Sequence, residues 1–248
     1  MKKIAVIFGT RPDTIKLAPI ILELKKYPND FKVVTIATAQ HRQMLDQVLS
    51  VFKITPDYDL NIMQAKQTLA TITQKIIGAL DEVLEKEKPD MVLVQGDTST
   101  TFVGGLAAFY RNIPVGHVEA GLRTNDKANP FPEELNRRLT SCVADLHFAP
   151  TATSAKALKK ENIPVESIYI TGNSVIDALK IAVHKNHLFT VPLLNTLAAK
   201  KKRIVLLTMH RRENLGAPMK GACEAVKDLS QHFSDIDLPG QIQRFLLE

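Results

Sequence analysis

The sequence predicts a doubly wound α/β fold, in which helices cover both faces of a mainly parallel sheet. Short apolar runs typical of buried strands alternate along the chain with segments whose apolar residues recur at helical spacing. The connections between them are short, as such a sheet requires. The composition agrees, because 45% of the 248 residues are hydrophobic and 23% are charged, which is ordinary globular usage.

The first half of the chain carries the clearest elements. Residues 3–8 form an apolar run that predicts a strand, Gly9-Thr10-Arg11-Pro12 breaks it, and a helix follows from Asp13 to Leu24. Pro89 ends a long helix before the next strand. Further elements are predicted as strands at 31–38, 90–95 and 113–118 and as helices at 41–52, 68–87 and 100–110.

The second half continues the pattern and then changes. Helices are predicted at 132–143, 153–161 and 173–184, and strands at 146–149 and 167–171. A polar connection with Pro192 leads to one more strand, 204–208, and one helix, 218–233. Because a single βα unit cannot bury its own apolar face, we expect an incomplete second α/β domain. The predicted boundaries are 1–172 for the first domain, 173–202 for a connecting helix and linker, and 203–248 for the second domain.

Composition and charge exclude several classes of protein. The net charge is +6, but aromatic residues make up only 6% and there is no Trp, so a small anionic ligand is favoured over nucleic acid. The longest apolar runs are too short to span a bilayer, and the amino terminus does not resemble a secretory signal. Cys142 and Cys223 lie far apart, which indicates neither a disulfide framework nor a zinc site. We expect a cytoplasmic protein.

Charged residues follow several predicted strands. Ligands of open α/β sheets bind beyond the carboxyl ends of the strands, so these residues are the candidates for chemistry. They are Gly9 to Pro12, Gly96 to Thr98, Glu119 to Gly121 and His210 to Glu213. The first group matches neither the G-x-G-x-x-G fingerprint nor a P-loop, which disfavours nicotinamide cofactors and ATP.

The cations among these residues have two interpretations. Arg11 and Lys16 beside a helix amino terminus favour a phosphate or pyrophosphate, or else both are solvated surface groups. His210 precedes two arginines, and an unperturbed histidine changes its charge near neutral pH, so this segment favours an anion. His117 is interpreted as a structural histidine inside a strand. The carboxylates and histidines lack metal-ligand spacing, so no metal site is expected.

The carboxylates also have alternatives. Asp97 is either a general base or metal ligand, or the N-cap of the helix that follows, and spacing alone favours the cap. Glu119 is either an acid/base group or the partner of Arg123 in a salt bridge. Glu133 lies in the first turn of a helix, four residues before Arg137, and the two can share one helix face.

Seven segments taken together resemble the non-hydrolysing bacterial UDP-N-acetylglucosamine 2-epimerases. They are Phe8 to Pro12 with Ile15-Lys16, Thr38 to Arg42, Gln95 to Thr98, Gly116 to Arg123, Pro132 to Glu134 with Asn136-Arg137, Thr171 to Asn173, and His210 to Asn214. The resemblance implies a fold similar to the GT-B glycosyltransferases, with a Rossmann-type first domain. It also implies elimination of UDP to give 2-acetamidoglucal, followed by re-addition of UDP with the C2 proton returned on the other face.

The same resemblance implies roles for individual residues. Asp97, Glu119 and Glu133 become the acid/base candidates, and which of them removes the C2 proton stays open. His210 and Arg11 would stabilise the diphosphate with help from Lys16, and His210, Asp97 and Glu119 would contact the substrate. A second UDP-N-acetylglucosamine would bind as an activator at Gln40, Gln43, Gln67, Glu133 and Arg211. Lys66 replaces the arginine of activator-binding members.

The resemblance fades after Asp235, and the D-S-G-G-x-Q-E-E motif of the family is absent from the 248 residues. We therefore expect a truncated epimerase that uses UDP-N-acetylglucosamine and no cofactor, with a homodimer left open. The alternatives are a non-catalytic remnant that binds a partner and a hydrolysing relative. The unbroken Gly116 to Arg123 segment favours the non-hydrolysing branch.

Overall fold

The computed structural model describes residues 1–38, 42–62, 67–183, 188–189, 191–199 and 216–232. The chain forms two compact units, Met1–His187 and Leu188–Glu248. The first unit contains a sheet with its helices. The described part of the second contains the helices α8 (Pro192–Ala199) and α9 (Ala217–His232).

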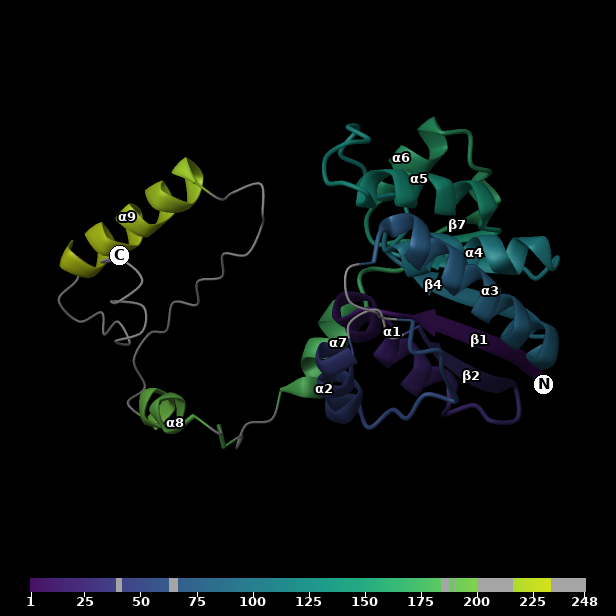
Figure 1. Ribbon diagram of the computed structural model, residues 1–248, viewed down its shortest axis with the longest axis horizontal. Helices are drawn as coiled ribbons and strands as arrows, with labels where there is room; N and C mark the ends of the chain where they lie inside the picture. The colour runs from purple at the N-terminus through teal and green to yellow at the C-terminus, as the bar shows by residue number, and fades with distance from the viewer. Residues whose placement is uncertain (39–41, 63–66, 184–187, 190, 200–215, 233–248) are drawn as a thin grey trace. The chain divides into compact units, whose positions relative to one another are not determined.

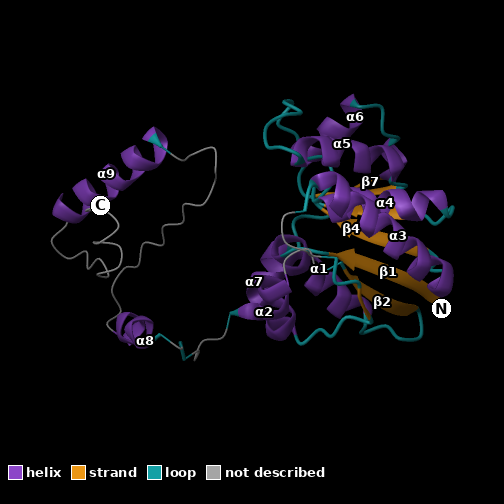
Figure 2. Cartoon of the chain, viewed as in Figure 1, coloured by secondary structure: helices purple, strands orange, loops and turns teal. Residues whose placement is uncertain are grey.

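The first unit is built on a seven-stranded parallel sheet with the order β3-β2-β1-β4-β5-β6-β7 (Figures 1 and 2). This order extends the Rossmann arrangement by one strand. The strands are β1 (Lys2–Phe8), β2 (Phe31–Ala37), β3 (Tyr58–Asp59), β4 (Met91–Gln95), β5 (Val115–Val118), β6 (Leu146–Ala149) and β7 (Ile168–Ile170).

Helices cover both faces of this sheet (Figure 1). On β1, Val6 and Phe8 pack with the helices α1, α2 and α7, whereas Ala5 and Ile7 pack with α3 and α4 on the opposite face. Burial on both faces explains why β1 is apolar from Ile4 to Phe8. The helices of the unit are α1 (Arg11–Leu24), α2 (Arg42–Phe52), α3 (Leu69–Glu87), α4 (Ser99–Tyr110), α5 (Glu133–Val143), α6 (Ala152–Lys160) and α7 (Val175–Ala182), with a 3₁₀ turn at Val165–Ser167.

The turn between β1 and α1 requires a glycine because the chain packs closely there. A Cβ atom at Gly9 would collide with the side-chain oxygens of Thr38 and Thr100, which are 2.9 Å apart and hydrogen-bonded to each other. The start of α1 is thereby held against the end of β2 and the start of α4. This fixes the edge of the sheet at which the candidate site lies.

The predicted doubly wound fold is confirmed, with small differences. β3 was not predicted, because a two-residue strand has too few residues for a periodic signal. α8 begins at Pro192, inside the segment interpreted as a polar connection; proline suits the first turn of a helix. Ala178 of α7 is buried in the first unit. The three predicted domain boundaries stay predictions, and the predicted strand 204–208 lies outside the described residues.

The described residues contain no helix that is long and apolar enough to cross a membrane.

Candidate functional site

The candidate site lies at the carboxyl edge of the sheet. Because all strands are parallel, the residues that follow them gather at one edge. Arg11 follows β1, Asp97 follows β4, Glu119 follows β5 and Asn173 follows β7. Two clusters of bonded side chains form there, one around Glu119 and one around Asp97.

Glu119 accepts hydrogen bonds from three segments of the chain. Lys16 Nζ and Gln95 Nε2 both lie 2.5 Å from Oε2, and Asn173 Nδ2 lies 2.8 Å from Oε1. The backbone of Glu119 has a φ of 63°, a left-handed conformation that costs a non-glycine residue on the order of 1 kcal/mol. The strain and the three donors together hold the carboxylate at a fixed place.

The alternative salt bridge between Glu119 and Arg123 is wrong. Arg123 Nε and Nη2 instead donate to the carboxylate of Glu161, at 2.8 and 2.7 Å. Glu119 lies in a turn after β5 and Arg123 in the loop that follows, so nearness in sequence does not bring the two side chains together. Glu119 is therefore free to take Lys16 of α1 as its cation.

Asp97 is held by α5. Arg137 donates to its Oδ2 through Nε at 3.0 Å and Nη2 at 2.6 Å, and Asn136 Nδ2 donates to its main-chain oxygen at 2.9 Å. The interpretation of Asp97 as an N-cap is wrong. The next residue, Thr98, caps α4 by accepting the N–H of Thr101 at 3.2 Å. The carboxylate of Asp97 is thereby left for other contacts.

Arg137 joins this cluster to a buried carboxylate. Its Nη1 donates to Glu134 Oε2 at 2.9 Å, and Glu134 also accepts the backbone N–H groups of Thr124 and Asn125 at 3.1 Å. Burial acts to raise the pKa of Glu134, but these hydrogen bonds outweigh it, so that the pKa lies below its ordinary value. For Arg137, burial is outweighed by the two carboxylates, which raise its pKa.

Glu133 is not the carboxylate that pairs with Arg137, as its spacing suggested. The ion pair is made by Glu134, three residues before the arginine. Oε2 of Glu133 is buried and has no hydrogen-bond partner in the described part of the chain. A buried carboxylate oxygen without a donor is unusual, so Glu133 stays a candidate residue of this edge.

The start of α1 contains another buried carboxylate, Asp13. It accepts the backbone N–H of Gly9 at 3.0 Å, of Thr10 at 2.8 Å and of Thr14 at 2.8 Å. Burial nevertheless raises its pKa to about 6. The N–H groups of Gly9 and Thr10 are therefore occupied by Asp13, and an anion at this helix start would depend on side chains. Arg11 is exposed and bonds to no other side chain among the described residues.

His117 is fully buried on β5, as the structural interpretation requires. Its Nε2 lies 2.8 Å from the main-chain oxygen of Gly96, and its Nδ1 has no partner among the described residues. Burial lowers its pKa to about 3, so the ring stays neutral at pH 7. Its position inside the sheet separates it from the carboxylates at the edge.

The remaining predicted residues are less informative. His210, Arg211 and Gln40 lie outside the described residues, and the side chain of Gln43 on α2 is not described. Gln67 donates to the main-chain oxygen of Ile62 at 3.0 Å. The activator set therefore stays a prediction.

Sequence reasoning gave no role to four residues of the two clusters. Glu134, Asn136 and Asn173 lie inside segments that carried the family resemblance, but only as members of a pattern. Gln95 ends an apolar strand, where a polar residue that points to the carboxyl edge is itself a signal.

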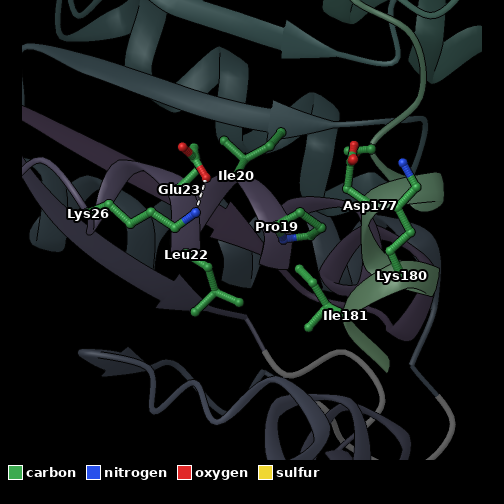
Figure 3. A pocket seen from close by; sticks show the side chains of 9 residues that line it. Pro19, Ile20, Leu22, Glu23, Lys26, Asp177, Lys180 and Ile181 are labelled. Carbon is green, nitrogen blue, oxygen red and sulfur yellow. Dashed lines mark hydrogen bonds and ion pairs between the residues drawn. The ribbon is translucent and has the colours of Figure 1, made fainter. Parts of the chain in front are cut away.

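A groove lies between α1 and α7, and Ser174, which follows Asn173, is among the residues that line it (Figure 3). Apolar side chains such as Ile20 and Ile181 line it, and an ion pair of Lys26 with Glu23 at 2.6 Å borders it. None of the predicted catalytic side chains lines this groove. In the described chain no three histidines, cysteines or carboxylates gather as metal ligands.

The strand order and the polar carboxyl edge define a Rossmann-like domain of the GT-B type. The chain belongs to the UDP-N-acetylglucosamine 2-epimerase family, whose sequence profile matches residues 23–238. The predicted family and fold are thus confirmed.

Individual relatives agree. UDP-N-acetylglucosamine 2-epimerase of Bacillus subtilis is 55% identical over 240 residues, which are 96% of this chain and 62% of that protein. The complex of S. aureus MnaA with UDP has a TM-score of 0.86 and 51% identity, over 95% of this chain and 61% of that one. The enzyme of Neisseria meningitidis bound to UDP-GlcNAc has a TM-score of 0.84 and 49% identity, over 94% and 63%. The chain spans about 62% of the length of such relatives.

Proposed function

We propose that this chain acts on UDP-N-acetylglucosamine as a non-hydrolysing 2-epimerase and interconverts it with UDP-N-acetylmannosamine. The observation that carries the proposal is the pair of fixed carboxylates, Asp97 and Glu119, at one edge of the sheet with Lys16 and Arg11. The names of the relatives support it, as does the binding of UDP-GlcNAc by a structural neighbour that is 49% identical.

The reaction explains why these residue types are needed. A base takes the proton from C2 while the C1–O bond breaks, so that UDP leaves with the bonding electrons and C1=C2 forms. The resulting 2-acetamidoglucal then takes UDP back at C1 and a proton at C2 from the opposite face. The two proton transfers require carboxyl groups, and the departing diphosphate requires cations.

Asp97 is the carboxylate best arranged to take the C2 proton. Arg137 binds only its Oδ2, while Oδ1 makes no hydrogen bond with the described residues. Its side chain is 28% exposed, compared with 9% for Glu119. One oxygen is thus held and the other is open to a substrate, which is the geometry of a positioned base. Glu119 and Glu133 remain the candidates for returning the proton.

The cations serve the leaving group. Arg11 is exposed and makes no ion pair with the described residues, so it can meet a diphosphate without losing a partner. Lys16 is bound to Glu119 and 23% exposed, and it can bridge that carboxylate and a phosphate oxygen. We propose that His210 completes the set.

The test follows the hydrogen at C2. The purified chain is incubated with UDP-N-acetylglucosamine in D₂O, and NMR measures deuterium at C2 and the appearance of UDP-N-acetylmannosamine. We expect both, and we expect Asp97→Asn to lower exchange at least about 100-fold, because it removes a general base. Asp90→Asn is the matched control, since Asp90 precedes β4 at the opposite edge of the sheet whereas Asp97 follows it.

Three outcomes contradict the proposal at different points. Absence of exchange in the unmodified chain at high concentration overturns the function. Release of free N-acetylmannosamine points to the hydrolysing class. Exchange by Asp97→Asn within twofold of the unmodified chain transfers the role of base to another carboxylate.

A further inference from the structure

We propose that Asn173 is a positioning residue that orients the carboxylate of Glu119 for proton transfer. The inference rests on the function proposed above, which gives Glu119 its role. It assigns a task to the Thr171 to Asn173 segment, for which neither the fold nor the reaction had supplied one.

Hydrogen-bond chemistry fixes the direction of the Asn173 amide. The backbone N–H of Val175, the first residue of α7, donates to Oδ1 of Asn173 at 3.0 Å. Because an N–H needs an acceptor, this oxygen faces Val175, and Nδ2 must point the other way. That nitrogen lies 2.8 Å from Glu119 Oε1. One side chain therefore starts a helix and donates to the carboxylate at the same time.

Asn173 is the only donor to Oε1 of Glu119 among the described residues, because Lys16 and Gln95 both bond to Oε2. Without Asn173, the carboxylate would be held at one oxygen and could turn about that contact. With it, both oxygens have fixed places. This matters for proton transfer, which depends on the position of a particular oxygen.

The path of the chain explains why position 173 can reach Glu119. β7 lies at the end of the sheet, while α7 packs on α1 near its middle. The chain must cross the carboxyl edge between the two, and Asn173 lies on this crossing. The next residue, Ser174, donates through Oγ to the main-chain oxygen of Lys16 at 2.6 Å. The crossing segment thus contacts both members of the ion pair between Lys16 and Glu119.

Two substitutions separate the two tasks of Asn173. Asn173→Asp and Asn173→Ser both keep an oxygen for the Val175 N–H, since Asp and Ser form the same kind of turn. Both remove the amide donor, and Asp also places a negative charge beside Glu119. Among the described residues, the polar groups that bond to the Glu119 carboxylate are Lys16 from α1, Gln95 from β4 and Asn173, and Lys16 is the cation of this set that offsets the added charge.

The first measurement needs no catalysis. Protein labelled with ¹³C at the glutamate carboxyl carbons is titrated by NMR, and the Glu119 signal is identified by its loss in Glu119→Gln. In Asn173→Asp we expect the pH midpoint of this signal to rise by about one pH unit, because a nearby like charge opposes ionisation. Asn173→Ser should shift it less. Asn112→Asp makes the same charge change before β5, whereas Glu119 follows this strand, and should leave the signal unchanged.

The second measurement is the exchange of C2 hydrogen in D₂O against pH. We expect Asn173→Ser to lower the exchange rate on the order of tenfold without a matching change in KM, and Asn173→Asp to move the pH profile with the NMR midpoint. An unchanged Glu119 signal in both folded variants overturns the inference. So does a shifted signal with exchange equal to that of the unmodified chain. Should the unmodified chain show no exchange, the proposed function fails, while the titration still decides whether Asn173 holds Glu119.

Discussion

The first turns of α1 and α5 each contain a buried carboxylate, and the pKa values of the two are shifted in opposite directions. Asp13 in α1 and Glu134 in α5 both accept backbone N–H groups of the loop before the helix. Both side chains thus hold a loop at the carboxyl edge of the sheet. Up to this point the two helix starts have the same design.

The difference is a guanidinium group. Arg137 pairs with Glu134 and holds its pKa below the ordinary value, whereas Asp13 has no ion pair among the described residues and burial raises its pKa to about 6. Backbone N–H groups alone do not offset the loss of water around a buried carboxylate, but a cation does. The two helix starts also differ in which residues they connect. Arg137 bonds to Asp97 as well, whereas Asp13 bonds to residues of its own turn, Gly9, Thr10 and Thr14.

The substitution with the largest expected effect on the free energy of unfolding is Arg137→Met. The variant leaves Glu134 buried without its close cation, and we expect the free energy of unfolding at pH 7 to fall by about 3 to 5 kcal/mol. Because Glu134 can then take up a proton at higher pH than before, the loss should be smaller at pH 4. Urea denaturation at the two pH values measures both effects.

The neighbouring arginine provides a matched control. Arg138 Nε lies 3.4 Å from the same carboxylate, but its side chain is 40% exposed. Arg138→Met should therefore cost no more than about 1 kcal/mol. Equal losses in the two variants would show that exposure does not decide the strength of these pairs, and the comparison between α1 and α5 would lose its basis.

The second test concerns the pH dependence that Asp13 contributes. The folded chain keeps this proton up to about pH 6, whereas the unfolded chain releases it near its ordinary pKa of 3.8. Between these values the folded state binds more protons, so the contribution of Asp13 to stability is complete below 3.8 and is lost as the pH rises through 6. The loss amounts to about 3 kcal/mol. Asp13→Asn should lack this component.

The measurement is the difference in the free energy of unfolding between Asp13→Asn and the unmodified chain at pH 4 and pH 7. The variant should gain relative stability by about 3 kcal/mol between them. Asp90→Asn serves as a control of opposite sign, because a backbone hydrogen bond from Lys3 and the charge of Lys2 lower the pKa of Asp90. A constant difference for Asp13→Asn would mean that its carboxyl titrates alike in both states.

The sequence predicted the strands and helices better than it predicted contacts between residues that lie far apart in the chain. The apolar runs predict a buried parallel sheet because a strand covered on both faces needs consecutive apolar residues, as from Ile4 to Phe8 of β1. They do not predict the partners of Asp97, since Arg137 lies 40 residues later and reaches it only once α5 has packed beside α4. The Asn173 contact with Glu119 spans 54 residues and depends on the strand order in the same way.

Two local interpretations in the candidate site were wrong. The salt bridge of Glu119 with Arg123 paired residues that are close in sequence, whereas Arg123 bonds to Glu161, 38 residues later. The interpretation of Asp97 as the cap of α4 overlooked Thr98, which is also a favoured capping residue and lies one residue closer to the helix. Spacing alone favoured the cap, whereas the family resemblance kept Asp97 among the acid/base candidates.

The smallest expected effect concerns Thr98, which caps α4 with an uncharged hydroxyl, whereas the starts of α1 and α5 use the carboxylates of Asp13 and Glu134. Thr98→Ala should lower the free energy of unfolding by about 1 kcal/mol, because it leaves the N–H of Thr101 without its side-chain acceptor. A hydroxyl does not titrate, so the loss should be the same at pH 5 and pH 7. Thr151→Ala removes an equivalent cap from α6, where Thr151 accepts the N–H of Ser154 at 3.1 Å, and should cost the same amount.

The two threonine variants together show whether the start of α4 is independent of Asp97. Equal and pH-independent losses mean that the hydroxyl alone caps α4 and the adjacent carboxylate is left to Arg137 and a substrate. A loss that changes with pH only in Thr98→Ala would mean that Asp97 moves onto the helix start when the hydroxyl is missing. In that case a carboxylate could also cap α4. Oδ1 of Asp97 would then accept a hydrogen bond from the helix start as well as serve as the proposed base.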